Sequence, residues 1–189
     1  MNKKMITVLL GGLLCTLPVT AKALIFQFNA GLNGANEVPA NSATATGIAT
    51  LFYNDNNSVL TTDDSYSFSL SAFGLTGVAT AMHIHAPAAP GFTAPPVVNL
   101  GALPFVSLNS GGTLLLGGVN VAPPNASFLS QLQAGLTYVN IHTAVYPGGE
   151  IRGQLTPVAV VPEPSTYAML LAGLALIGWT ARRHAKAAR

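Results

Sequence analysis

The chain has 189 residues, half of them hydrophobic, yet only 7% are charged and the formal net charge is +2. Residues 24–161 carry five acidic side chains and one basic side chain, a net charge of −4, so the excess positive charge lies at the two ends. A segment without a basic patch cannot neutralise phosphates, which excludes nucleic acid as an expected partner. Its length suits one domain with one core, and its apolar content excludes intrinsic disorder.

The first 23 residues have the pattern of a secretory signal peptide. Lys3 and Lys4 precede an apolar run over residues 5–17, and residues 21–23 form an A-x-A sequence. The run is shorter than the roughly 20 residues that a membrane span needs, so an uncleaved anchor is the less favoured alternative. We expect cleavage after Ala23, which removes the only cysteine and leaves a domain without disulfides.

Short extended segments dominate the part of the chain that follows. Strands are expected at residues 24–32, 45–54, 65–73 and 79–85, and two short apolar runs bounded by glycine lie at 97–101 and 112–119. The alternation is clearest in residues 65–73, where Tyr66, Phe68 and Leu70 face one way and serines face the other. The Pro-rich segment 86–96 is expected to be a loop, because proline is excluded from central strands.

One helix is expected near the end of this domain, at residues 125–135, with an apolar stripe and Gly135 as its end. Two last strands are expected at 137–143 and 150–157, joined by a Tyr-Pro-Gly-Gly turn. Many short strands separated by Gly and Pro turns predict an all-β fold, an antiparallel Greek-key-like sandwich or small barrel.

The C-terminal tail has three parts. Pro162, Glu163 and Pro164 lie in a linker over residues 158–165, an apolar segment follows at 166–181, and residues 182–189 contain Arg182, Arg183 and further basic side chains. The apolar segment is at the short limit for a transmembrane helix, and the basic residues would keep the tail cytoplasmic. A buried core helix is the alternative, and it fits poorly with a terminal segment that is apolar all round.

This three-part tail resembles the PEP-CTERM sorting signal of Gram-negative bacteria. The resemblance implies recognition by an exosortase at the inner membrane, cleavage near the Pro-Glu-Pro motif, and export from a membrane-anchored precursor to the cell surface or the extracellular matrix.

Residues 24–157 contain three further landmarks: "LNGANEVP", "MHIHAPA" and "GLTYVNIHTAVYPGGEIRGQL". Together they resemble the CHRD domain, named from chordin. The resemblance implies an exported β domain, and it leaves the ligand open, because the role of this family is poorly defined.

Three histidines form a candidate metal site. His83 and His85 are two apart in an expected strand and therefore share a face, and His142 lies on the outward face of a later strand. If the two strands are close, three imidazoles converge, and neutral imidazole suits copper or zinc. The alternative is that these histidines form hydrogen bonds that fix loop geometry.

Arg152 is the only base of the mature domain, so it is expected to be buried and paired with Glu37 or Glu150 as a structural ion pair.

The favoured function is a surface or matrix protein with a binding or structural role, whose partners include polysaccharide or surface proteins. A copper- or zinc-binding protein is the first alternative. A redox enzyme is the least favoured, because no nucleophile or cofactor motif is present and no catalytic residue is assigned.

Overall fold

The computed structural model describes residues 23–56, 63–159 and 164–187. The expected signal peptide therefore lies almost wholly outside the described residues, as do Pro162 and Glu163. The elements are β1 (Leu24–Asn33), η1 (Gly34–Asn36), β2 (Thr46–Asp55), β3 (Ser65–Phe73), β4 (Ala79–His85), β5 (Pro96–Asn99), β6 (Val106–Ser110), β7 (Thr113–Val121), α1 (Phe128–Gln133), β8 (Thr137–Thr143), β9 (Ile151–Pro157) and α2 (Pro164–Ala187).

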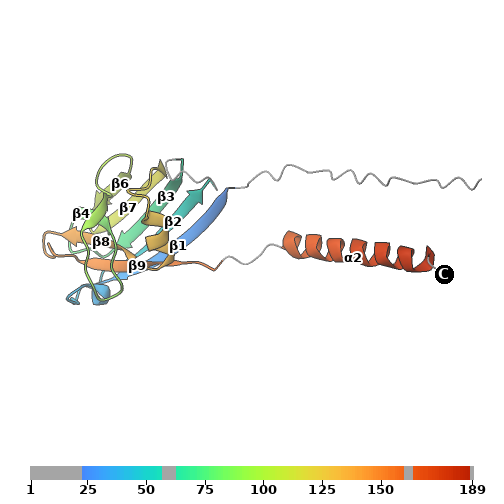
Figure 1. The fold of residues 1–189 in the computed structure, drawn as a ribbon. Helices are drawn as coiled ribbons and strands as arrows, with labels where there is room; N and C mark the ends of the chain where they lie inside the picture. Colours follow the sequence, from blue (N-terminus) through green and yellow to red (C-terminus); the bar gives the residue numbers. More distant parts are fainter. Residues whose placement is uncertain (1–22, 57–62, 160–163, 188–189) are drawn as a thin grey trace, which may run out of the picture.

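Within the described residues the strands form one curled antiparallel sheet in the order β5-β4-β8-β9-β1-β2-β3-β7-β6 (Figure 1). The sheet folds over at β1 and β9, which pair at only three positions, Phe28–Pro157, Asn29–Thr156 and Asn33–Arg152. Between those positions a Cβ atom on Gly153 would lie 2.6 Å from the carbonyl oxygen of Gly31, so only glycine permits this close crossing. The all-β prediction is confirmed, in a half-barrel form.

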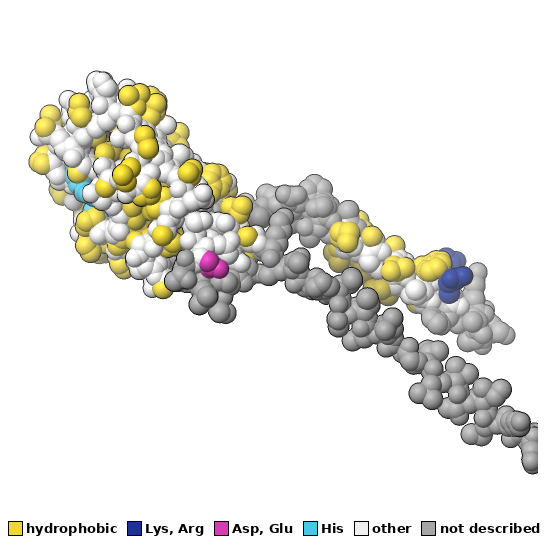
Figure 2. Space-filling model, turned by 90° about the horizontal axis from the view of Figure 1, so that it is seen from above, with side chains coloured by type: hydrophobic (Ala, Val, Ile, Leu, Met, Phe, Trp, Pro, Cys, Tyr) yellow, Lys and Arg dark blue, Asp and Glu magenta, His cyan; other side chains and the backbone are white. Residues whose placement is uncertain are grey.

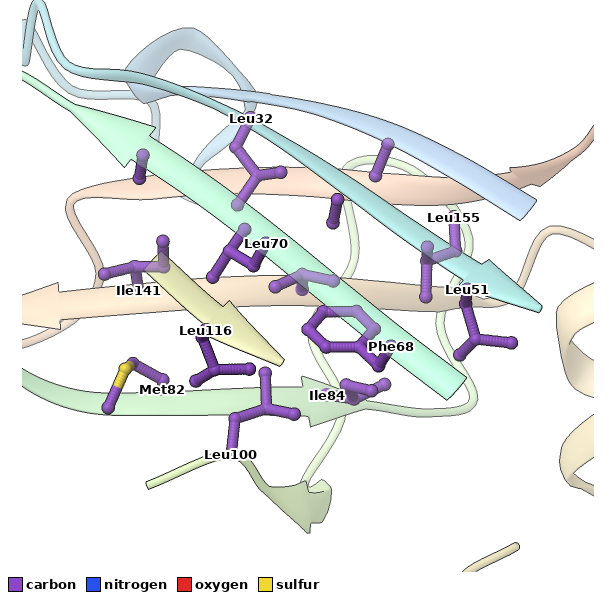
Figure 3. Packing of buried hydrophobic residues seen from close by; sticks show 14 of the residues in the cluster. Leu32, Leu51, Phe68, Leu70, Met82, Ile84, Leu100, Leu116, Ile141 and Leu155 are labelled. Atoms are coloured by element: carbon purple, nitrogen blue, oxygen red, sulfur yellow. The ribbon is translucent and has the colours of Figure 1, made fainter. Parts of the chain in front are cut away.

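The hydrophobic core fills the space between the two halves of the curled sheet. β3 contributes Phe68 and Leu70 from one side, and β4 and β8 contribute Ile84 and Ile141 from the other (Figure 3). The alternation of β3 predicts this arrangement correctly, because Tyr66, Phe68 and Leu70 are at most 2% exposed while the serines between them are not buried. One face of each half therefore packs inward, and the other faces are left for loops or solvent.

Two side-chain contacts hold the curl together. The amide of Asn109 on β6 accepts a hydrogen bond from the backbone NH of Ala79 (3.0 Å) and donates one to the carbonyl of the same residue (2.8 Å), so it joins the edge strand β6 to the start of β4. Glu150, fully buried just before β9, accepts from the backbone NH of Thr76 and from the hydroxyls of Thr76 and Thr143.

The tail forms helix α2, as expected from the apolar pattern (Figure 1). The apolar pattern predicts that residues 166–181 cross a membrane. In the part of the chain that the structure describes, none of the helices has the length and apolar character needed to do so. At the end of α2 the guanidinium of Arg183 lies over the ring of Trp179, 4.5 Å from its centroid.

Candidate metal centre

The outer face of strands β4 and β8 carries polar side chains under a cover of loops. β4 and β8 pair in antiparallel register, with His83 opposite Asn140 and Ile84 opposite Val139. Because Ile84 and Val139 point into the core, the neighbouring His83, His85 and His142 must point to the opposite face. The Pro-rich loop 86–96 covers this face, which explains why β8 is buried on both sides at nearly every position.

The three predicted histidines do come together. One ring nitrogen from each of His83, His85 and His142 lies within 4.8 Å of the others. The ring of His83 lies between the other two, with centroids 5.5 Å from His85 and 5.3 Å from His142. Figure 2 shows histidine (cyan) at the surface of the domain, so the cluster is close to solvent.

Backbone carbonyls fix the orientation of two of these rings. The Nδ1 atom of His85 lies 2.8 Å from the carbonyl oxygen of Ala94, and that of His142 lies 3.0 Å from the carbonyl oxygen of Pro147. A carbonyl can only accept, so Nδ1 is the protonated nitrogen in both rings. In a neutral ring the Nε2 atom then carries a free lone pair, and the Nε2 atoms of His85 and His142 are both buried without a hydrogen-bond partner.

The surroundings favour the neutral form of His83 and His85. Burial lowers the pKa of His83, and the neighbouring His142 adds to this effect. Burial also lowers the pKa of His85; the hydrogen bond to Ala94 raises it in part, and the positive charges of His83, His142 and Arg152 lower it further. Neutral imidazoles are the form that binds metal ions.

Tyr138 and Arg152 extend the cluster into a stack. The ring of His85 lies parallel to that of Tyr138, with an interplanar angle of 4° and centroids 4.7 Å apart. The guanidinium carbon of Arg152 lies 3.4 Å from the centroid of the Tyr138 ring, a cation–π contact. The Tyr138 hydroxyl contacts the backbone of Ala94, so the residue that orients His85 is itself held by this stack.

Arg152 is 2% exposed, but its contacts differ from a simple ion pair. Its Nη2 atom donates to the carbonyl of Phe92 at 2.7 Å. Its interaction with Glu37 is electrostatic: against the larger effect of burial on each group, Arg152 lowers the pKa of Glu37 and Glu37 raises the pKa of Arg152. No hydrogen bond joins the two side chains, because the Oε1 atom of Glu37 has no partner and its Oε2 atom accepts from Asn140 at 3.4 Å. Glu150 is held by threonines instead, because it precedes β9 and does not share its alternation.

A polar cavity of about 240 Å³ opens beside the stack. Its lining includes the side chains of Glu37, Arg152 and Gln154, with small apolar residues such as Ala35 and Pro90. The Nε2 atom of Gln154 donates to the carbonyls of Ala88 and Gly135, which leaves its Oε1 atom as an acceptor. The cavity therefore offers both donors and acceptors next to the histidines.

The histidine cluster fits a metal ion with nitrogen ligands. Copper and zinc accept three imidazoles, and zinc lies about 2.0–2.1 Å from each nitrogen, so small side-chain rotations would have to draw the rings together. The carbonyls bonded to Nδ1 of His85 and His142 are the outer partners that metal-bound histidines generally have. Sequence reasoning missed Tyr138 as part of the cluster, although its place four residues before His142 on one strand face is a signal for it.

Comparisons with known proteins identify two parts of the chain. Residues 160–184 match the model of the PEP-CTERM protein-sorting motif, which indicates exosortase-dependent export and sorting to the cell surface. Searches of curated proteins and of solved structures each found no match. Residues 28–155, more than half of the chain, match the CHRD domain model and include all three histidines. The chain therefore belongs to the CHRD domain family.

Proposed function

We propose that this protein is an exported metal-binding protein of the cell surface, which holds one copper or zinc ion through His83, His85 and His142. The single observation that supports this most strongly is the pair of buried Nε2 atoms, on His85 and His142, that have no hydrogen-bond partner. An unpaired buried acceptor is costly, and a metal ion at the centre of the cluster would satisfy both lone pairs.

The alternative, that the histidines only fix loop geometry, explains the Nδ1 contacts but not the Nε2 atoms. A ring that served only to hold Ala94 or Pro147 would need one nitrogen, and its other nitrogen could face solvent. Here the Nε2 atoms of His85 and His142 are buried without a hydrogen-bond partner, and each of the three rings has one nitrogen within 4.8 Å of the others. The proposal concerns binding and assigns no turnover.

Elemental analysis of the exported protein, purified without a His-tag or chelator, tests the proposal. We expect about one copper or zinc per chain in the wild type and less than a tenth of that in a His85→Asn/His142→Asn double variant, because two of three ligands are lost. Ser107→Asn is the control, since this residue is exposed on β6, lies outside the cluster and precedes the Pro-Glu-Pro motif, so the exported domain retains it. Circular dichroism checks that the double variant is folded. A folded wild type that takes up neither metal when both are added contradicts the proposal.

A role in the extracellular matrix is a second proposal. The cavity lined by Glu37, Arg152 and Gln154 offers both hydrogen-bond donors and hydrogen-bond acceptors, which the hydroxyl groups of a polysaccharide can pair with. Surface proteins are the other partners we propose, with a membrane-anchored precursor as the starting form. Co-sedimentation with purified exopolysaccharide checks this role: an Arg152→Gln variant that is folded but pellets as well as the wild type would contradict it.

A further inference from the structure

The outer face of strands β2, β3, β7 and β6, on the opposite side of the sheet from the core, exposes an unusual number of large apolar side chains. They are between 40% and 72% exposed: Ile48, Phe52, Phe73, Val106, Leu108, Leu115 and Val119. Single exposed apolar residues are normal, but these belong to neighbouring strands of one sheet. A continuous apolar patch of this kind marks an interaction surface.

The pairing register shows that this face has a groove between two ridges. Ser71 lies between Ile48 and Leu115, and the row continues to Leu108. In the next row, Ser69 and Gly117 lie between Thr50 and Val106. Small residues along β3 thus form a floor, and larger ones on β2 and on β6 and β7 form the walls. Open cavities of about 440 Å³ and 480 Å³ lie over this floor.

The face carries no charge over residues 46–54, 65–73, 106–110 and 113–121, which make up almost all of these four strands. A partner that bound through charged groups would have nothing to pair with here. An identical uncharged face, by contrast, meets no like-charge repulsion when it packs against itself, although the domain as a whole is acidic.

We propose that this face is the interface of a homodimer, in which the β2 ridge of one copy lies in the β3 groove of the other. A two-fold axis makes such a contact self-complementary, because each copy offers one ridge and one groove. Two sheets packed face to face lie about 10 Å apart with strands within about 30° of each other, which lets apolar side chains from both copies interdigitate.

The size of the face approaches that of a standard protein–protein interface. Four strands of about eight residues cover a flat footprint of about 500 Å² at the usual strand spacing and rise per residue. The accessible surface of a ridged face is larger than its footprint, which brings it near the roughly 600–1,000 Å² that each partner buries in a standard interface. The interface is independent of the histidine cluster, which belongs to β4 and β8.

Analytical ultracentrifugation of the exported protein, recovered without detergent, tests the proposal. We expect the wild type to be a dimer, and Ile48→Glu and Leu108→Glu each to weaken dimerisation more than tenfold, because each places two like charges in an apolar interface. Val145→Glu is the matched control, since Val145 is 63% exposed on the loop between β8 and β9, away from this face. The control should dimerise as the wild type does.

Two results would overturn the dimer: a wild type that is monomeric at every soluble concentration, or a dimer that both glutamate variants leave intact. If the monomer instead binds exopolysaccharide and Ile48→Glu abolishes that binding, the face belongs to a polymer and the dimer is likewise rejected. Metal content measured on the same samples should be equal in all variants, so the outcome is separate from that of the metal proposal.

Discussion

Glu37 is the acidic residue whose ionisation the fold opposes most clearly. It is 7% exposed, and burial raises the pKa of its carboxyl group from 4.5 to about 7, although Arg152 and the hydrogen bonds to Asn140 and Val38 lower it in part. The Oε1 atom of Glu37 and the Oδ1 atom of Asn140 are both buried acceptors without a partner. Protonation of Glu37 provides the donor that this pair of acceptors lacks.

This raised pKa predicts how stability depends on pH. Between about pH 4.5 and 7 the folded protein keeps the Glu37 proton while the unfolded chain releases it, so the folded state binds more protons and its free energy of unfolding falls as the pH rises. The stabilisation is fully present below pH 4.5 and is lost as the pH rises through about 7. We expect Glu37→Gln, which is neutral and of the same shape, to remove this slope and to be more stable than the wild type at pH 8 by on the order of 2 kcal/mol.

Urea melts of both proteins at several pH values between 4 and 8 measure the effect of Glu37→Gln. Equal pH slopes in the wild type and the variant would contradict the assignment to Glu37. The comparison rests on the difference between the two proteins at each pH, because every other titrating group is common to both.

At the scale of elements, the link between the edge strand β6 and the start of β4 depends on one side chain. The side-chain amide of Asn109 makes the two hydrogen bonds to Ala79 that the backbone of a neighbouring strand would otherwise make: it accepts from the NH and donates to the carbonyl of that residue. Without these two bonds the start of β4 would have no link to β6, which otherwise pairs only with β7. At this edge of the described sheet a side chain thus makes the contact for which a closed barrel would use strand pairing.

We expect Asn109→Ala to destabilise the domain by about 1–3 kcal/mol, since two hydrogen bonds are lost and a backbone NH and carbonyl lose their partner. Ser107→Ala, at an exposed position on the same strand, should change stability by less than about 0.5 kcal/mol. Urea melts provide both values. A loss in Asn109→Ala no larger than in Ser107→Ala would show that the contact to Ala79 does not matter.

The sequence predicts β3 and β8, which have at least one buried face, and it does not predict β6, which has no buried face. β3 and β8 appear where alternation places them, but β6 was not expected, because Val106 and Leu108 both face solvent and the strand exists through its pairing with β7. The helix expected at 125–135 is shorter, at Phe128–Gln133. The Asn125 side chain accepts from the NH of Ser127 and holds the preceding residues in a turn, while Gly135, at φ 67°, follows the helix in the left-handed region.

The candidate site follows the same logic. The shared face of His83 and His85 and the outward face of His142 were predictable from strand alternation. That the rings meet is predicted only on the condition that the two strands are close, and the pairing of β4 with β8 meets that condition. The contacts of Arg152 were not predictable, because they depend on how loop 86–96 folds over β8 and places the carbonyl of Phe92. The conformation of a loop has no periodic sequence pattern from which it could be predicted.

At the scale of the whole molecule, charge separates the targeting ends from the domain. The described basic side chains of the tail are arginines at the end of α2, which Figure 2 shows in dark blue, while the domain has one buried base. The PEP-CTERM match indicates that this tail directs export and surface sorting. Sorting and metal binding are therefore expected to be separable functions of the chain.

Replacing the Pro-Glu-Pro motif tests that separation. We expect Pro162→Ala/Glu163→Ala/Pro164→Ala to reduce the surface-exposed or released fraction at least tenfold and to retain the precursor in the cell membrane, because the exosortase no longer recognises it. The retained protein should still bind metal in the wild-type amount. Fractionation followed by immunoblotting measures the distribution, with Ser165→Ala as the matched control. Unchanged surface exposure of the triple variant would show that another signal directs sorting.

The position of Arg152 affects how readily extracellular proteases can cut the domain. Between Lys22 and Arg182 it is the only basic residue of the chain. Extracellular proteases of the trypsin type recognise a basic residue at the bond that they cut. Here that residue is 2% exposed, lies on a central strand and is covered by the ring of Tyr138 and the carbonyl of Phe92. The folded domain thus offers such enzymes no accessible peptide bond, so they can cut it only after β9 unfolds locally.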